Sequence, residues 1–329
     1  MKLKSAKILV TGAGGFIGSH LVEALHAAGA DVTALVHYDS RPDFSNLELL
    51  SEETRDEIRI VSGNVEDPHL ISSVVQGQDI VFHLAALIAI PYSYVAPLSY
   101  VRTNVEGTLN VLEACRTHQT PRLIHTSTSE TYGTAQYKPI DEKHPLQGQS
   151  PYSATKIAAD KLAESFYLSY RLPVITVRPF NAYGPRQSAR AVVPAIISQA
   201  LSQPAVRLGS LTPLRDLTYV LDTVAGFLAV AECDAAVGQV VNLGTGTAIS
   251  IGDLAALILR KLGIEKKIVV DPDRIRPEGS EVESLLCSAR KAEELSGWRP
   301  RFNLERGISE TVEFIRAHPE RFRPAAYNR

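Results

Sequence analysis

The sequence predicts an α/β protein built on a parallel, doubly wound sheet, with a smaller α/β lobe in its C-terminal part. Three observations predict this class. Strand-like and helix-like segments alternate from the first residues. The first strand-like run, KILVTG, is apolar enough to be fully buried. A glycine-rich stretch joins that run to the first helix-like segment. With 329 residues, 45% hydrophobic and 21% charged, the chain can form one large domain or two fused ones.

The elements expected in the first 180 residues follow one another in order. The apolar run 7–12 leads into an amphipathic segment, 17–29, that ends at a helix-terminating glycine, Gly29. Apolar runs then continue to alternate with segments of helical period. Strands are therefore expected over 7–12, 31–37, 79–86, 121–129 and 173–180, and helices over 17–29, 104–118 and 151–170.

The pattern loosens after about residue 180. Short strands are expected over 203–210, 215–220, 239–244 and 266–270, and helices over 191–201, 222–232, 249–263 and 304–318. Two units follow: residues 1–180 with about 216–246 form the larger domain, and about 181–215 with 247–329 form the lobe. The lobe is expected to cover the carboxyl edge of the sheet, where ligands of open α/β sheets bind.

Charge and composition exclude several classes of function. The formal net charge is −2, so neither nucleic acid nor an anionic membrane is an expected partner. The three cysteines share no CxxC spacing, which favours reduced thiols in a cytoplasmic protein over a disulfide framework. No apolar stretch reaches the roughly 18 residues of a membrane-spanning helix, and the N-terminus lacks a signal-peptide run. No metal site is expected.

The stretch TGAGGFIG carries Gly12, Gly15 and Gly18 in GxxGxxG spacing between a strand and a helix. Gly12 permits a tight turn, Gly15 lets the backbone approach a pyrophosphate, and Gly18 allows close helix–strand packing. The helix N-terminus adds unpaired N–H groups for the phosphates. This context predicts a Rossmann dinucleotide-binding domain, with Phe16 and Ile17 in its phosphate loop.

The end of the second strand does not choose between NAD and NADP. Val36 stands where a carboxylate for the NAD ribose is expected. His37, Asp39 and Arg41 follow nearby. Arg41 could accept a 2′-phosphate, whereas Asp39 could hold a ribose hydroxyl. His37 and Arg41 are taken as candidate cofactor contacts.

Tyr152 and Lys156 lie four residues apart on a predicted helix and therefore share a face. Ser150 suits the N-cap and Pro151 the first helical position, which puts Tyr152 at the positive end of the helix dipole. The dipole, the ammonium of Lys156 and a nicotinamide cation are each expected to lower the pKa of Tyr152. A tyrosine tuned in this way can accept a proton from a sugar hydroxyl while a hydride leaves the same carbon.

These motifs resemble the extended short-chain dehydrogenase/reductases of the NAD-dependent epimerase/dehydratase family. The resemblance covers essentially the whole length, through TGAGGFIG, HLAA at 83–86, TSTSETYG, YSATK, RPFNAYGPRQ, RDLTYVLD and NLGTG. It implies that Thr128 binds the oxygen on sugar carbon 4, Tyr152 is the base, and Lys156 holds the cofactor ribose. It further implies cofactor contacts at Asn64, Val65, Leu84, Ala85, Ala86 and Asn104.

Glu130 is the residue that separates the reactions within this family. Epimerases usually carry small residues after the catalytic hydroxyl, whereas the GDP-mannose type of 4,6-dehydratase carries Thr-Ser-Glu, as in Thr128, Ser129 and Glu130. A carboxylate there can remove the carbon-5 proton and then help the carbon-6 hydroxyl leave as water. UDP-glucuronate decarboxylases share the motif and, with 4-epimerases, remain alternatives. The surrounding sequence is most similar to dehydratases of legionaminic-type pathways, which use GDP-linked N-acetylglucosamine.

The second lobe is expected to grip the nucleotide diphosphate of a sugar nucleotide, GDP-linked by preference and UDP-linked as an alternative. Arginine forks bind phosphate oxygens bidentately, and asparagine offers a neutral donor. The candidate substrate residues are Asn181, Arg186, Arg190, Arg215, Asn242 and Arg276.

Family likeness also implies a tightly held, recycled NAD or NADP and a homodimer packed through the helices at 104–116 and 152–161. A non-catalytic dinucleotide-binding sensor is the alternative from another class. The intact set of Thr128, Tyr152 and Lys156 argues against it.

Overall fold

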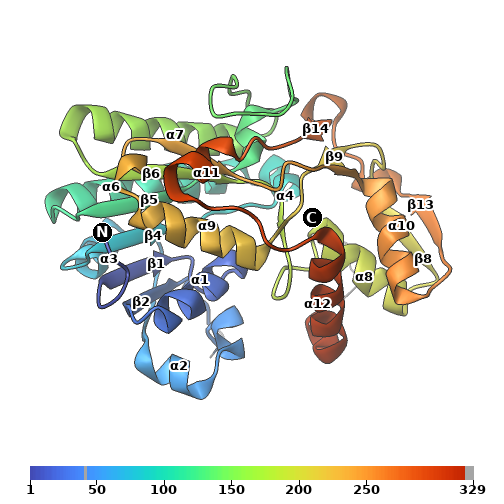
Figure 1. Cartoon of the computed structure of the whole chain (residues 1–329), viewed down its shortest axis with the longest axis horizontal. Helices are drawn as coiled ribbons and strands as arrows, with labels where there is room; N and C mark the ends of the chain where they lie inside the picture. Colours follow the sequence, from blue (N-terminus) through green and yellow to red (C-terminus); the bar gives the residue numbers. More distant parts are fainter. Residues whose placement is uncertain (41–42, 323–329) are drawn as a thin grey trace.

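The computed structural model describes residues 1–40 and 43–322. Its main feature is a seven-stranded parallel sheet in the order β11-β6-β5-β4-β1-β2-β3, which confirms the predicted doubly wound Rossmann class (Figure 1). The strands are β1 Lys7–Thr11, β2 Asp31–Val36, β3 Arg59–Ser62, β4 Ile80–His83, β5 Arg122–Thr126, β6 Val174–Pro179 and β11 Val240–Leu243. Strands β2 and β3 are added on one side of β1, and β4, β5, β6 and β11 on the other, so the strand order reverses between β1 and β4. The crevice outside the carboxyl ends of these two strands is where ligands of such sheets bind.

Two helical layers cover the sheet because successive residues of a buried strand point to opposite faces. On β1, Ile8 and Val10 join one apolar cluster, while Leu9 joins the other. The first layer contains α1 Phe16–Ala27 and α9 Val220–Glu232, and the second contains α3 Pro68–Val75, α6 Gly107–Thr117 and α7 Pro151–Tyr170. The central strand β1 is therefore buried on both faces from Ile8 to Thr11, as the sequence predicted.

The structure adds elements to the expected series. The strand β3 was not predicted. It lies at the edge of the sheet with half-exposed residues, so its sequence contains no long apolar run. Helix α3 precedes β4, and the short helices α2 Glu52–Glu57, α4 Ile90–Val95 and α5 Pro97–Tyr100 fill two connections. The helix expected from residue 104 is instead continuous with a π-helical stretch, Val101–Glu106, that leads into α6.

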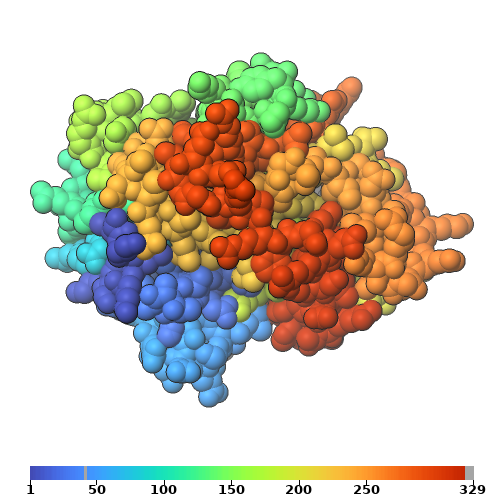
Figure 2. Space-filling model, viewed as in Figure 1, coloured from blue at the N-terminus to red at the C-terminus, as the bar shows by residue number. Residues whose placement is uncertain are grey.

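Beyond β6, short elements surround the carboxyl edge of the main sheet, and we refer to them as the second lobe (Figure 1). Figure 2 shows orange residues of this part at the right of the molecule and the blue N-terminal residues at the lower left. Helices α8 Val192–Ser202, α10 Ile251–Leu262 and α12 Leu304–Ala317 accompany the parallel pair β8 Ala205–Leu208 and β13 Lys267–Val270. A small sheet joins β12 Ile249–Ser250, β9 Leu214–Arg215 and β14 Ser284–Leu285, and β7 Ala182–Tyr183 pairs with β10 Thr218–Tyr219. Helix α11 Arg290–Ser296 lies beside β11 and α9.

One expected strand is divided in the structure. The segment 215–220 does not form a single strand, because Arg215 belongs to β9, which pairs with β12 and β14, whereas β10 pairs with β7. The intervening Asp216 is fully buried and binds the backbone of Thr245, Gly246 and Cys287. Across residues 1–40 and 43–322, every helix is too short or too polar to cross a membrane.

Candidate active site

A cleft of about 1640 Å³ opens at the carboxyl edge of the sheet, between the two lobes. The glycine loop forms one wall, the ends of β4 and β5 and the start of α7 form the floor, and loops of the second lobe close the other side. Most predicted cofactor residues line it: Gly12, Gly15, Phe16, Ile17, Gly18, His37, Asn64, Val65, Leu84, Ala85, Ala86, Tyr152 and Lys156. Arg41 lies outside the described residues.

The glycine loop packs so closely against neighbouring backbone that its glycines could not carry side chains. Gly12 has a positive φ of 70°, and a Cβ there would lie 2.8 Å from the backbone nitrogen of Ala85. A Cβ on Gly18 would lie 2.2 Å from the carbonyl oxygen of Gly12. Gly15 caps α1 without a side-chain hydrogen bond, so the first N–H groups of the helix have no side-chain acceptor. This cradle fits the pyrophosphate of a dinucleotide.

Thr11 was not among the predicted residues, although it organises the cofactor wall. Its hydroxyl accepts hydrogen bonds from the backbone nitrogens of Leu84 at 3.2 Å and Ala85 at 3.1 Å. The same oxygen lies 2.8 Å from Nδ1 of His83, whose pKa burial lowers well below its usual value. Because the Thr108 hydroxyl donates to the Asn104 carbonyl, it accepts from Nε2 of the neutral imidazole, and Nδ1 then accepts from the Thr11 hydroxyl. A hydroxyl at the strand end before a glycine loop is the signal that points to such a role.

The prediction that Asn104 contacts the cofactor needs a correction. Asn104 is fully buried and is not part of the cleft lining. Its Oδ1 accepts from the backbone nitrogen of Leu87, and its Nδ2 donates to the Leu87 carbonyl and to Thr155. The side chain therefore braces the wall of the cleft from behind, since both of its polar atoms are already engaged.

The segment after β5 carries the predicted hydroxyl and carboxylate. Thr128 caps the 3₁₀ turn Ser129–Tyr132, and its Oγ1 accepts from the Glu130 nitrogen at 3.3 Å. Thr128, Ser129 and Glu130 all line the cleft, and the Glu130 residue is only 8% exposed. The structure thus brings Glu130 into the same cleft as Tyr152 and Lys156.

The N-terminus of α7 forms as the sequence predicted. Ser150 and Ser153 form a reciprocal capping box, and Pro151 occupies the first turn. Tyr152 then faces the cleft beside Thr128, whose side chain favours the ionised form of the phenol. Burial raises the pKa of Tyr152, and the Thr128 side chain offsets only part of this rise. The predicted lowering of the Tyr152 pKa is therefore absent in the chain without cofactor. Burial removes water that would stabilise the phenolate, and this loss outweighs the groups that favour the phenolate.

Lys156 is almost fully buried one helical turn after Tyr152. Its Nζ donates to the carbonyl oxygen of Thr126 at 2.6 Å. Burial lowers the pKa of Lys156 to about 8, and the nearby carboxylate of Asp160 opposes this shift. At neutral pH the side chain is mostly an ammonium, which a tyrosinate or a ribose oxygen in the cleft can use as a hydrogen-bond donor.

The second-lobe side of the cleft is lined by the predicted Asn181, Arg186, Arg190, Arg215 and Arg276. Glu281, which was not predicted, accepts from Arg215 at 3.0 Å and lies 3.5 Å from Arg276 through the same Oε1. Burial lowers the pKa of Arg215, while the charges of Glu130 and Glu281 act in the opposite direction. On this side, Arg215 and Arg276 therefore share a single carboxylate, that of Glu281.

Arg186 and Asn242 differ in placement from the other predicted substrate residues. Arg186 turns toward the glycine-loop helix, where its Nη2 lies 2.8 Å from Glu23. Asn242 is fully buried and does not line the cleft; its Oδ1 accepts from the Tyr132 hydroxyl at 2.8 Å. The prediction of a direct substrate contact by Asn242 is thus corrected, because β11 places it behind the 3₁₀ turn.

Comparisons with known proteins agree with this geometry. The family model described as GDP-mannose 4,6 dehydratase matches residues 9–311. A dTDP-glucose 4,6-dehydratase of Streptomyces antibioticus is 33% identical over 314 residues, which are 94% of this chain and 92% of the relative. A UDP-glucose 4-epimerase of Mycolicibacterium smegmatis is 34% identical over 316 residues, covering 94% and 98% of the two chains.

Among solved structures, the dTDP-glucose 4,6-dehydratase DesIV of Streptomyces venezuelae, with NAD and TYD bound, superposes with a TM-score of 0.88. It is 27% identical, and the match covers 97% of this chain and 99% of that one. As the sequence motifs predicted, the chain therefore belongs to the NAD-dependent epimerase/dehydratase family of short-chain dehydrogenase/reductases that contains the nucleotide-sugar 4,6-dehydratases and epimerases.

Proposed function

We propose that the protein is a nucleotide-sugar 4,6-dehydratase that forms a 4-keto-6-deoxy sugar. The observation that carries this proposal is Glu130, a carboxylate that lines the same cleft as Thr128, Tyr152 and Lys156. The relatives named as dTDP-glucose 4,6-dehydratases support it.

NAD is the proposed cofactor, held by the Gly12–Gly18 cradle, the segment after β4 and Lys156. DesIV, with NAD bound, supports this choice over NADP. When bound, NAD supplies a hydride acceptor that also returns the hydride within one turnover, so the reaction uses no net cofactor. Two features of this chain suit the phosphates of NAD: a glycine loop whose turn is too closely packed for any Cβ, and a helix N-terminus without a side-chain cap.

The first chemical task of the chain is to take the proton from the hydroxyl on sugar carbon 4. Tyr152 accepts this proton, and Thr128 orients the oxygen through the hydroxyl that already meets Tyr152. Because burial raises the pKa of Tyr152, the ammonium of Lys156 must stabilise the tyrosinate while the proton moves. The resulting ketone acidifies the proton on carbon 5.

The second task is the loss of water, which falls to Glu130. Its carboxylate removes the carbon-5 proton, and the electrons of that bond form the double bond to carbon 6. The hydroxyl on carbon 6 leaves with the proton that Glu130 has just accepted, so water is released and the carboxylate is restored. One carboxylate thus acts as base and then as acid. The proton that Tyr152 took in the first step balances the proton that carbon 5 gains when the hydride returns to carbon 6.

The nucleotide is the less defined part of the proposal. The sequence favoured GDP, whereas the relatives described above are named for dTDP- and UDP-sugars and do not favour it. Arg215 and Arg276 suit any nucleoside diphosphate, because guanidinium groups bind phosphate oxygens and not the base. We also propose a homodimer that packs through the two predicted helices. The apolar side chains of Leu98, Val101 and Leu168, on or beside these helices, are exposed and could be buried in such an interface.

The purified protein should be incubated with NAD and, separately, with dTDP-glucose, UDP-glucose, GDP-mannose, GDP-N-acetylglucosamine and UDP-glucuronate. Mass spectrometry is expected to find one nucleotide sugar that loses the mass of one water. Loss of carbon dioxide from UDP-glucuronate would instead identify a decarboxylase. An unchanged mass with inverted carbon 4, detected by NMR, would identify an epimerase.

Glu130→Gln tests the role of the carboxylate within the same assay. The variant should still oxidise carbon 4, seen as reduced-cofactor absorbance, because Thr128, Tyr152 and Lys156 are unchanged. Water loss should slow by about 10²–10⁴-fold, the usual contribution of a general acid–base group. Turnover at the wild-type rate would remove Glu130 from the mechanism.

A further inference from the structure

A buried ion pair lies directly beneath the segment that carries Glu130. Asp160 follows Lys156 by one turn of α7, and Arg178 stands on β6; both side chains are 4% exposed. The Nε and Nη2 atoms of Arg178 donate to Oδ2 of Asp160 at 3.1 and 2.8 Å. Burial by itself would raise the pKa of Asp160, but His125 and the charge of Arg178 outweigh it and lower the pKa to about 2.

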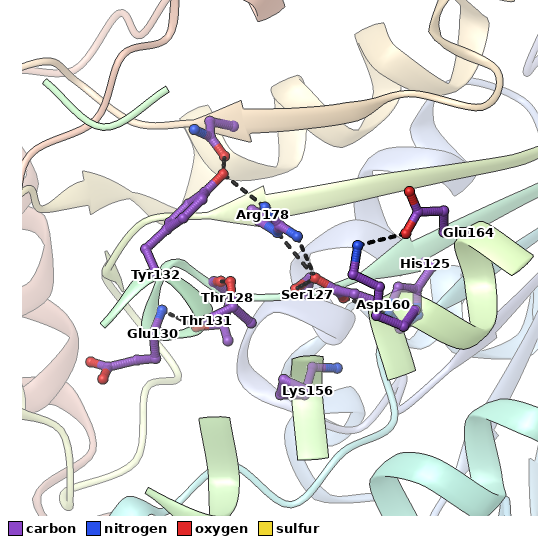
Figure 3. Close-up of polar contacts among 12 residues, drawn as sticks. His125, Ser127, Thr128, Glu130, Thr131, Tyr132, Lys156, Asp160, Glu164 and Arg178 are labelled. Atoms are coloured by element: carbon purple, nitrogen blue, oxygen red, sulfur yellow. Dashed lines mark hydrogen bonds and ion pairs between the residues drawn. The ribbon is translucent and has the colours of Figure 1, made fainter. Parts of the chain in front are cut away.

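The pair holds both ends of the Ser127–Tyr132 segment. At one end, the Ser127 hydroxyl donates to Oδ2 of Asp160 at 2.8 Å. At the other end, Nη1 of Arg178 donates to the Tyr132 hydroxyl at 2.9 Å, and the guanidinium carbon lies 4.8 Å from the centre of the Tyr132 ring. Figure 3 shows Arg178 between Tyr132 and Asp160, with Glu130 pointing away from the pair.

The arrangement joins the two elements that carry the reacting groups. Asp160 belongs to the helix of Tyr152 and Lys156, and Tyr132 ends the 3₁₀ turn of Glu130. Tyr132 is fully buried and donates to Asn242 on β11, so the turn is also fixed to the sheet. Asp160, Arg178, Tyr132 and Asn242 thus form a continuous chain of four hydrogen-bonded side chains from α7 through β6 and the 3₁₀ turn to β11.

Stability alone is a weak reason for such a pair. Removing two charges from water costs several kcal/mol each, and apolar replacements of similar shape are often at least as stable. A hydrogen-bonded buried network does, however, fix the relative position of the segments that it joins. Here those segments are the ones on which the catalytic geometry depends.

We propose that Asp160, Arg178 and Tyr132 are positioning residues that set the orientation of Glu130 relative to Tyr152 and Lys156. The inference rests on the proposed dehydratase function and adds that the two chemical steps depend on different parts of the network. The Tyr132 end of the network controls the water-loss step, because it holds the turn that carries Glu130. Oxidation at carbon 4 depends on Thr128, Tyr152 and Lys156 and is less sensitive to that end.

Tyr132→Phe tests the inference, since it removes one hydroxyl and keeps the ring. In single turnovers, the rise of reduced-cofactor absorbance should stay within about 3-fold of the wild type, while water loss slows by about 10-fold or more, because small misplacements of a catalytic group are costly. Reduced cofactor should therefore accumulate transiently. Amide hydrogen exchange should also become faster over 128–131, a readout that needs neither cofactor nor substrate.

Tyr219→Phe is the matched control. Tyr219 is also buried, and its hydroxyl donates to Glu310 at 2.6 Å, but it does not line the cleft. Its variant should lose comparable thermal stability and leave the ratio of the two steps unchanged. Equal slowing of both steps in Tyr132→Phe, or no change in their ratio, overturns the inference.

Failure of the proposed function would look different from failure of this inference. If the wild-type chain removes water from none of the nucleotide sugars, the dehydratase proposal itself fails. If the wild type forms the dehydrated product and Tyr132→Phe keeps its step ratio and its hydrogen exchange, only the positioning role fails. Asp160→Asn tests the other end of the network. Because the Asp160 carboxylate also favours the charged form of Lys156, this variant should slow carbon-4 oxidation as well as water loss, and unchanged oxidation would overturn the assignment of that end.

Discussion

The two sides of the cleft are constructed differently. On the catalytic side, Thr128 and Glu130 follow a buried strand, and Tyr152 and Lys156 lie on a 20-residue helix. Hydrogen bonds within this side join regular elements of the main sheet and its covering helices, as in the contact of Lys156 with the Thr126 carbonyl. Glu130, Tyr152 and Lys156 are buried there, and Thr128 is half-buried.

The second-lobe side relies on loops and two-residue strands. Arg215 and Arg276 stand around Glu281, and the Arg276 side chain is 25% exposed. Ion pairs of this kind can exchange one carboxylate for another anion with little change in geometry. The difference suggests that the catalytic side is constructed for fixed distances, whereas the second-lobe side is constructed to accept the charge of a ligand.

Removing the catalytic hydroxyl of Tyr152 should have the largest effect. Tyr152→Phe is expected to lower kcat by about 10³-fold or more. Tyr152 lies beside Thr128 and one helical turn before Lys156, and no other residue that lines the described cleft has both of these neighbours. Thermal stability should change little. Stopped-flow absorbance of reduced cofactor checks the oxidation step directly, and a variant that still oxidises carbon 4 at the wild-type rate would assign the base to another residue.

Changing Arg215 to lysine should have an intermediate effect and should act on binding. Arg215→Lys keeps a positive charge but loses the fork that can hold two oxygens, so KM for the nucleotide sugar should rise by about 10–100-fold with a smaller change in kcat. Arg276→Lys is the matched comparison, with a smaller rise expected because this side chain is more exposed. Titration calorimetry with the free nucleoside diphosphate measures the same difference without turnover. A fall in kcat at unchanged KM would contradict the division between the two sides.

The catalytic side was also the easier one to predict from sequence. Its residues lie in two short stretches, and the strand end and helix start that carry them have local signals: an apolar run before Thr128, and a Ser-Pro start before Tyr152. The fold class was predictable for the same reason, since buried strands and amphipathic helices are legible in consecutive residues. The edge strand β3 lacked that signal because its residues are half exposed.

Contacts between distant parts of the chain could not be predicted in this way. The pair Asp160–Arg178 and the carboxylate of Glu281 between two arginines depend on how strands and loops meet in space. Asn104 and Asn242 were assigned to ligands from motif position, but packing places them behind the cleft walls. A motif can indicate that a residue lies near the site, but it does not indicate whether the side chain points into the cleft or supports the cleft wall from the other side.

The smallest expected effect is on folding stability and concerns the contact between α1, which follows the glycine loop, and the Pro185–Arg186 loop. His20 on α1 lies 3.0 Å from the carbonyl oxygen of Pro185, next to the ion pair of Glu23 with Arg186. Burial, with the charge of Arg186, lowers the pKa of His20 to about 4. Between pH 6.5 and 4 the unfolded chain therefore binds a proton that the folded chain excludes, and folding stability falls as the pH is lowered.

His20→Gln should reduce this acid sensitivity, because glutamine can still donate to the Pro185 carbonyl but does not titrate. Urea unfolding at pH 7 and pH 5 should show the wild type losing more stability than the variant, by at most about 1.4 kcal/mol per pH unit. Some loss should remain in both proteins, since burial also lowers the pKa of His83 and His125. Equal losses in the two proteins would mean that His20 stays solvated enough to titrate normally, and that the joint between α1 and the Pro185–Arg186 loop is looser than its contacts indicate.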